Sequence, residues 1–333
     1  MKEAVLLLAH GTPDVLGEMA EYLSKVTGGR ALPQEVVEEL QHRYGEIGLG
    51  WELGEEPPPL TKWTLTQGFL LEKALGTKVY VGMRNWHPYI AEVVDEMRAD
   101  GVTRIKALCL APQNSRTSVG LYRRVLMDAA VGMEVEFVTG WAEQPLLAQA
   151  FAEKTWPVWA QACAEAGRRV PVLFTAHSVP CRTIMTGAAS IAGARPGTPV
   201  QATPDPYPVE AKRTAQLVAE KLSVVGFTEQ DWVFAFQSQG ISGGPWIGPT
   251  VEDTLKALKE QGEVGVVMQP VGFLCDHVEI LYDIDIAFRK TAEDLGLKLW
   301  RAESLNDSAT LVEALVEVVT GRYQADVDEV VVA

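Results

Sequence analysis

Short apolar runs alternate with amphipathic stretches along this chain. A short continuous run of apolar residues is typical of a strand that is buried on both faces of a parallel sheet. The pattern predicts strands at 5–9, 79–83, 105–110, 135–139, 172–175, 232–236, 265–269 and 297–300.

Helical periodicity fills most of the intervals between these runs. It predicts helices at 34–44, 61–75, 89–100, 118–130, 144–166, 209–222 and 309–319, another that runs through Val26, and another that ends at Gln261. Two stretches rich in Gly and Pro, 45–59 and 187–208, are expected to be long surface loops.

Strands that alternate with helices form parallel sheets covered on both faces. Four strand–helix units in each half predict an α/β protein with two similar Rossmann-like domains, each a four-stranded parallel sheet flanked by helices. We place the first domain at 1–140 and the second at 141–333, with the last helix free to pack back on the first.

Polar side chains follow directly after several of the predicted strands. Ligands of open parallel sheets bind outside the carboxyl ends of the strands, so these side chains are candidates for a site. If the two sheets face each other, the side chains would meet in one interdomain cleft. The candidates are His10, Arg84, Ser115, His177, the segment 237–240 and the segment 276–279.

The stretch 270–283 follows the strand at 265–269 and contains Asp276, Glu279 and Asp283. If the stretch is helical, the spacing i, i+3 and i+7 puts the three carboxylates on one face. Like charges on one face repel, so the face either is solvated or holds a cation. Both interpretations fit the spacing.

His10 and His177 occupy equivalent places in the two halves. Imidazole can act as a base or as a metal ligand near neutral pH. A lone histidine at a strand end is more often a structural hydrogen-bond partner, but the equivalence of the two positions favours a functional role. Arginines near strand ends or loops, such as Arg30 and Arg84, could pair with ligand carboxylates or be solvated surface charges.

The segment 240–249 is rich in Gly but is not a phosphate loop. It lacks the glycine patterns of nucleotide-binding loops. Pro245 and Pro249 also remove backbone N–H donors that a phosphate would need. We predict a stiff wall in which Trp246 presents a flat apolar face, the alternative being a tryptophan in the core.

Composition narrows the classes of function. The 333 residues carry 29 Lys and Arg against 44 Asp and Glu, a net charge of −15. This charge argues against nucleic acid and anionic lipid as partners. No apolar run approaches the roughly 20 residues of a membrane span. The four cysteines are far apart in the sequence and form no Cys-x-x-Cys pair, so a reduced, cytoplasmic location is expected.

Three segments together resemble the ferrochelatases, enzymes that insert ferrous iron into a porphyrin. They read Thr-Ala-His-Ser-Val-Pro at 175–180, Gln-Ser at 237–238 with Pro-Trp-Ile-Gly-Pro at 245–249, and Pro-Val-Gly-Phe at 270–273 with Asp-His-Val-Glu-Ile-Leu-Tyr-Asp at 276–283. Weaker similarity covers nearly the whole chain. The resemblance implies two Rossmann-like domains around a porphyrin cleft.

The same resemblance implies a lyase of haem biosynthesis that inserts ferrous iron into coproporphyrin III or protoporphyrin IX and releases two protons. It makes His177 and Glu279 the catalytic pair, and His177, Glu279 and Asp283 the residues that meet the metal. Porphyrin contacts are then expected from His10, Arg30, Arg84, Ser115, Tyr122, Gln237, Ser238 and Trp246.

Iron is the substrate in this interpretation, and no tightly bound cofactor is expected. Some relatives hold a two-iron cluster on four clustered cysteines, but the cysteines of this chain are scattered, so we predict no iron–sulfur cluster. Porphyrin and ferrous iron are the expected partners, with transient contacts to neighbouring enzymes of the haem pathway.

The chain departs from the family pattern in several places. His10 stands where relatives commonly carry Tyr, Met or another residue, and an imidazole there could ligate iron. Ala287 replaces a third acidic residue of the helix that bears Asp283, so the outer metal route is altered. The serine expected to contact a propionate is missing near 48–60, and the longer loop at 187–208 could act as a lid.

Three other functions compete with iron insertion as interpretations of the sequence. A cobalt or nickel chelatase would usually be smaller and lack the Gln-Ser and Pro-Trp segments. A haem or porphyrin carrier could use His10 and His177 as axial ligands, but it has no need of Glu279 and Asp283 as a proton route. A nucleotide-binding protein would need a phosphate fingerprint, which is absent.

Overall fold

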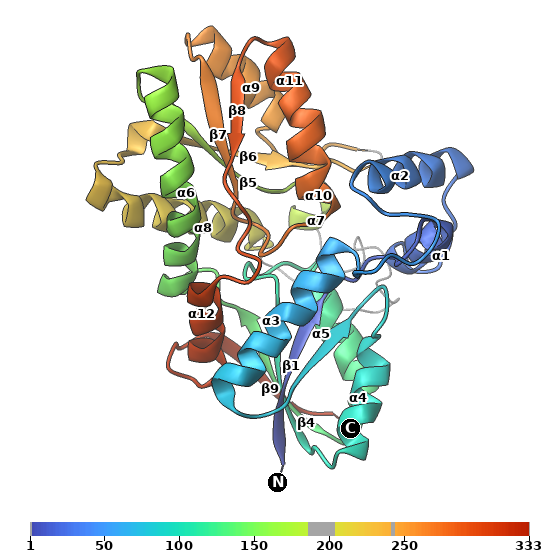
Figure 1. The fold of residues 1–333 in the computed structure, drawn as a ribbon. Helices are drawn as coiled ribbons and strands as arrows, with labels where there is room; N and C mark the ends of the chain where they lie inside the picture. The colour runs from blue at the N-terminus through green and yellow to red at the C-terminus, as the bar shows by residue number, and fades with distance from the viewer. Residues whose placement is uncertain (1, 186–203, 241–243, 333) are drawn as a thin grey trace.

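A computed structural model describes residues 2–185, 204–240 and 244–332, and within them the chain forms two sheets flanked by helices (Figure 1). The first sheet has the order β2-β1-β3-β4-β9 and the second the order β6-β5-β7-β8. The strands are β1 (Glu3–Ala9), β2 (Val79–Met83), β3 (Arg104–Cys109), β4 (Glu134–Gly140), β5 (Val172–His177), β6 (Trp232–Gln237), β7 (Gly265–Pro270), β8 (Lys298–Arg301) and β9 (Asp326–Val331).

Helices connect the parallel strands and cover both faces of each sheet (Figure 1). They are α1 (Met19–Val26), α2 (Gln34–Glu46), α3 (Pro59–Leu75), α4 (Ile90–Ala99), α5 (Val119–Ala129), α6 (Pro145–Ala166), α7 (Cys181–Met185), α8 (Tyr207–Leu222), α9 (Val251–Glu260), α10 (Val278–Leu281), α11 (Arg289–Asp294) and α12 (Ala309–Val319), with a π-helical turn η5 (Asp283–Phe288) between α10 and α11.

The predicted α/β class is confirmed, and each of the eight predicted strands is present. The first sheet differs from the prediction of four parallel strands, because β9 adds an antiparallel edge next to β4. Most residues of β9 are exposed and several are acidic, so it lacks the apolar run that marked the other strands. The domain division at residue 140 stays a prediction, although β9 from the second half completes the first sheet.

The prediction of three carboxylates on one helix face is wrong. His277 is the N-cap of α10, so Asp276 lies before the helix. The Asp276 carboxylate accepts hydrogen bonds from Ser304 Oγ at 2.7 Å and Asn306 Nδ2 at 3.0 Å. Glu279 and Asp283 therefore remain as the acidic pair of this stretch.

The largest group of buried apolar side chains belongs to both sheets at once. Leu7 of β1 and Leu108 of β3 come from the first sheet, and Val172 and Phe174 of β5 from the second. Helices α6, α8 and α12 supply much of the rest, and α12 packs against both α6 and α3. We call this group the shared core, and it ties the two sheets into one unit.

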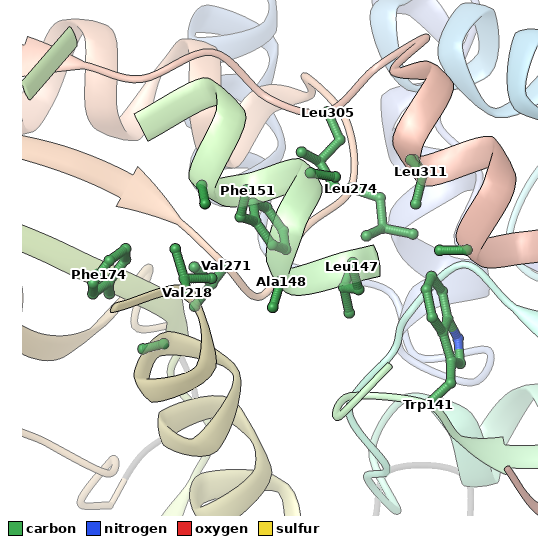
Figure 2. Close-up of a cluster of buried hydrophobic side chains, with 14 of the residues drawn as sticks. Trp141, Leu147, Ala148, Phe151, Phe174, Val218, Val271, Leu274, Leu305 and Leu311 are labelled. Atoms are coloured by element: carbon green, nitrogen blue, oxygen red, sulfur yellow. The ribbon is translucent and has the colours of Figure 1, made fainter. Parts of the chain in front are cut away.

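Helix α6 runs through the middle of the shared core. Figure 2 shows its residues Leu147 and Phe151 between Phe174 of β5 and Trp141, which follows β4. Leu147, Phe151 and Phe174 are fully buried. Removal of such side chains from water is the main favourable term in folding, so α6 contributes to holding both sheets.

Leu147→Ala tests the shared core. We expect it to lower the free energy of unfolding by roughly 2–5 kcal/mol, because it removes buried methyl groups and leaves a cavity. Chemical denaturation measures the change. Leu53→Ala is the matched control, because Leu53 is 77% exposed, and it should stay within about 0.5 kcal/mol of the unaltered protein. Equal effects of the two substitutions would contradict the assignment of Leu147 to the core.

Candidate active site

A pocket of about 1550 Å³ opens where the carboxyl ends of the two sheets meet. Residues after β1, β2 and β3 line one side of it, and residues after β5, β6 and β7 line the other. Helices α1 and α2 contribute further lining. The volume exceeds the roughly 300–1,000 Å³ of ordinary small-molecule sites, so a large ligand is a suitable occupant.

His177 and Glu279 form the charged centre of the pocket. His177 is the last residue of β5, and Glu279 lies in the first turn of α10. The imidazole Nε2 lies 3.0 Å from Glu279 Oε1, while Nδ1 donates to the Ser178 carbonyl. A carbonyl and a carboxylate can only accept, so this geometry suits a ring with protons on both nitrogens.

The pKa values of this pair move apart for a definite reason. Burial alone would lower the pKa of His177, but the charge and hydrogen bond of Glu279 outweigh it and raise that pKa to about 9. Burial alone would raise the pKa of Glu279, but His177 and then His277 hold it well below its usual range. The pair therefore rests as imidazolium and carboxylate near neutral pH.

A second histidine contacts the same carboxylate. His277 Nε2 lies 3.3 Å from Glu279 Oε2, and its Nδ1 lies 2.9 Å from the Cys275 carbonyl. Each oxygen of Glu279 thus faces one imidazole. Gln237 helps to hold the backbone of Glu279 in place, because its Nε2 donates to the Glu279 carbonyl at 2.8 Å.

Asp283 lies one turn beyond Glu279 and has its own partners. Ser238 Oγ donates to Asp283 Oδ2, and Arg43 Nη1 of α2 lies 3.7 Å from Oδ1. Burial raises the pKa of Asp283, and the Ser238 hydrogen bond only partly offsets this. Ser238 has a φ of 62°, a left-handed conformation that is costly for a residue with a side chain and tends to persist at functional sites.

His10 lines the first-domain side of the same pocket. Asn85 Nδ2 lies 3.0 Å from His10 Nε2, and Tyr22 OH lies 3.2 Å from Nδ1. Burial, followed by the positive charge of Arg84, lowers the pKa of His10 to about 4. The His10 ring is therefore neutral at physiological pH, unlike that of His177.

Most of the other predicted contact residues also line the pocket. They are Arg30, Arg84, Ser115, Tyr122, Ser238 and Trp246. Gln237 does not line it, because its side chain is buried against Thr175 Oγ1 and the Glu279 carbonyl. The predicted lid spans residues 187–208, and residues 187–203 of it lie outside the described part of the chain.

Several pocket residues were missed by the sequence reasoning. Tyr22 of α1, Arg43 and Tyr44 of α2, and His277 line the pocket, although none follows a strand directly. The helical period places Tyr22 and Tyr44 on apolar faces, which looks like ordinary packing. His277 lies inside the segment 270–283, which the sequence analysis identifies as a candidate site. That position is the one sequence signal for a role of His277.

Within the described ranges, no three His, Cys, Asp or Glu side chains gather closely enough to hold a metal ion. His177, Glu279 and Asp283 are thus not assembled as a three-ligand site, and their contact with iron stays a prediction. Cys109, Cys163, Cys181 and Cys275 are free thiols. None of the described helices is long and apolar enough to cross a membrane.

Comparison with known proteins identifies the family to which this chain belongs. The sequence profile of the ferrochelatase family matches residues 2–323. A ferrochelatase of Acidobacterium capsulatum is 58% identical over 316 residues, which cover 94% of this chain and 92% of the relative. A coproporphyrin III ferrochelatase of Geobacillus thermodenitrificans is 32% identical over 337 residues, covering 98% and 97% of the two chains.

Solved structures support the fold. The sirohydrochlorin chelatase SirB from Bacillus subtilis subspecies spizizenii, in complex with cobalt, aligns with a TM-score of 0.50 and 11% identity over 96% of this chain and 94% of its own. The expected fold, with two chelatase-like halves around a cleft, is confirmed. This chain belongs to the ferrochelatase family and is a lyase that inserts iron into a porphyrin in haem biosynthesis.

Proposed function

We propose that this chain inserts ferrous iron into coproporphyrin III and that His177 and Glu279 take up the pyrrole protons. The observation that carries the proposal is the charged pair itself, an imidazole and a carboxylate 3.0 Å apart in a pocket large enough for a macrocycle. Iron and porphyrin are both substrates here, and the chain's own groups handle the protons.

Metal insertion must move two protons. A free porphyrin carries two pyrrole N–H groups, and both protons leave as the ferrous ion enters. A positioned base accepts such protons best when its pKa lies near the working pH. Glu279 makes His177 a stronger base, but the raised pKa of about 9 also keeps His177 protonated near pH 7. The form of His177 that accepts a proton is the one that has first lost its own.

The segment around Trp246 forms a wall of the pocket beside His177. Backbone hydrogen bonds join Cys181 N to the Pro245 carbonyl at 2.9 Å and Ile247 N to the Val179 carbonyl at 3.0 Å. The Trp246 ring centroid lies 6.4 Å from that of His177. Because these hydrogen bonds fix the wall, we expect it to hold the macrocycle in a puckered shape. Binding energy offsets the strain of that distortion.

Arginine side chains favour the substrate with more carboxylates. Arg30, Arg43, Arg84 and Arg182 all line the pocket. Coproporphyrin has four propionates and protoporphyrin has two, and guanidinium groups bind carboxylates well. The name of the Geobacillus relative supports the same porphyrin.

The carrier hypothesis, with His10 and His177 as axial ligands, loses support. The family relationship makes the chain an enzyme. In addition, both ring nitrogens of His10 face protein groups, and His177 Nε2 faces Glu279. A cytoplasmic location and transient contact with neighbouring enzymes of the pathway stay predictions.

Replacement of His177 by Ala tests the proposed base. We expect anaerobic iron insertion, followed by absorbance, to slow by about 10²–10⁴-fold, the usual contribution of a positioned acid or base. His87→Ala is the matched control, because His87 lies outside the pocket with a side chain that is 58% exposed. A His177→Ala variant that keeps its rate would contradict the assignment.

The pH dependence of single-turnover insertion tests the pairing with Glu279. The pKa of His177 is raised, so its neutral, proton-accepting form grows as pH rises toward about 9, and the rate should rise with it. In Glu279→Gln the carboxylate that contributes most to the raised pKa of His177 is gone, so the rise in rate should move to lower pH. An unchanged profile in Glu279→Gln would refute the coupling.

Parallel assays with coproporphyrin III and protoporphyrin IX test the substrate. The proposal expects a higher kcat/KM for coproporphyrin III. It also expects Arg30→Gln to raise KM more for the substrate with four propionates than for the one with two. Arg322→Gln serves as the control, because Arg322 does not line the pocket. Faster insertion into protoporphyrin IX would overturn the substrate assignment while leaving the proton chemistry intact.

A further inference from the structure

The ring of His10 is held by protein groups at both nitrogens. Its Nδ1 lies 3.1 Å from the Gly11 carbonyl and 3.2 Å from Tyr22 OH. Its Nε2 lies 3.0 Å from Asn85 Nδ2. His10 lines the pocket, but Asn85 does not line it and is almost fully buried. The Nε2 lone pair is therefore directed to a side chain behind the pocket wall.

The protonation state of the ring follows from these partners. The Gly11 carbonyl can only accept, so Nδ1 carries the proton. Arg84 and burial keep the ring neutral, which leaves Nε2 as an acceptor for the Asn85 N–H. An imidazole in this state has one lone pair that could bind iron, and Asn85 occupies it.

The fold fixes this contact at the ends of neighbouring strands. β1 and β2 are parallel, and backbone bonds continue past their ends from Arg84 N to the Ala9 carbonyl and from Asn85 N to the His10 carbonyl, each at 2.9 Å. Gly11 has a φ of 86°, and a Cβ there would lie 2.8 Å from Trp86 N. The tight turn keeps His10 beside Asn85.

We propose that Asn85 is a positioning residue that keeps His10 from binding the iron of the finished haem. The inference rests on the proposed function, because it concerns the product of that reaction. A haem whose iron is bound by the His10 imidazole would be released slowly. Because Asn85 takes the Nε2 lone pair, the product is left without a ligand from the His10 side and can leave.

Asn85→Leu tests this role, because leucine has a similar size and no N–H. Ferric iron–coproporphyrin III is added ready-made to the purified protein and followed by absorbance and EPR. We expect no sign of His10 ligation in the unaltered protein, and in Asn85→Leu a His10-dependent change of the absorbance and EPR spectra, which we call the ligation signal. We also expect steady-state kcat to fall about tenfold, while single-turnover insertion keeps its rate, because product release becomes limiting.

Two further variants separate ligation from a structural effect. The double variant Asn85→Leu/His10→Phe should lose the ligation signal, because it has no imidazole at position 10. Asn85→Asp should also stay without the signal, because a carboxylate would hold a proton on Nε2. His10→Phe as a single substitution should leave the spectrum of the bound product unchanged. This comparison tests the proposal without a substitution at Asn85.

The proposal is overturned if the unaltered protein shows a ligation signal that His10→Phe removes. It is also overturned if Asn85→Leu, shown to be folded by its circular dichroism, keeps the spectrum of the unaltered protein. Failure of iron–coproporphyrin III to bind at all would instead contradict the proposed substrate. Ferric protohaem, the oxidised form of the product made from protoporphyrin IX, is then the probe in the same comparison.

Discussion

The site depends on an apolar core that the two sheets share. Open parallel sheets bind ligands at their carboxyl ends, so a site between two sheets needs both edges at a fixed separation. The shared core provides this, because α6 and α12 pack residues of both halves into one buried cluster. Close packing resists small displacements, and a hydrogen-bonded pair tolerates displacements of only a few tenths of an ångström.

The second half of the chain contributes an ionised pair to the pocket, and the first half contributes the neutral imidazole of His10. His177 and Glu279 stabilise each other's charges inside a partly apolar pocket. A raised histidine pKa stabilises the fold fully below pH 6.5, and this contribution is lost as pH rises through about 9. The depressed pKa of Glu279 stabilises the fold above pH 4.5, and this contribution is lost as pH falls through the lowered value.

His10 shows how the same side chain becomes a different group. It lies near Arg84 rather than near a carboxylate, and its ring nitrogens face Asn85, Tyr22 and a carbonyl. One pocket thus holds a charged histidine and a neutral one. The two histidines lie at the end of the first strand of each half, and their difference comes from the segments that hold Glu279 beside His177 and Arg84 and Asn85 beside His10.

Much of this architecture could be predicted from the sequence, because buried parallel strands leave continuous apolar runs. The exposed edge strand β9 leaves no such run, and it was missed. The segment 270–283 was identified as central, but the position of the helix start was not, so Asp276 was assigned to a face it does not occupy. The roles of Asn85 and Arg43 depend on contacts between distant segments, and a local pattern carries no signal for these.

The most direct test of the central claim is the pKa of His177 in the free protein, measured by NMR of labelled histidine. The chain has five histidines, and the spectrum of His177→Ala assigns the signal. The account predicts titration near pH 9 in the unaltered protein and at a clearly lower pH in Glu279→Gln. Titration of His177 at or below 6.5 in the unaltered protein would contradict a charged pair at the centre of the site.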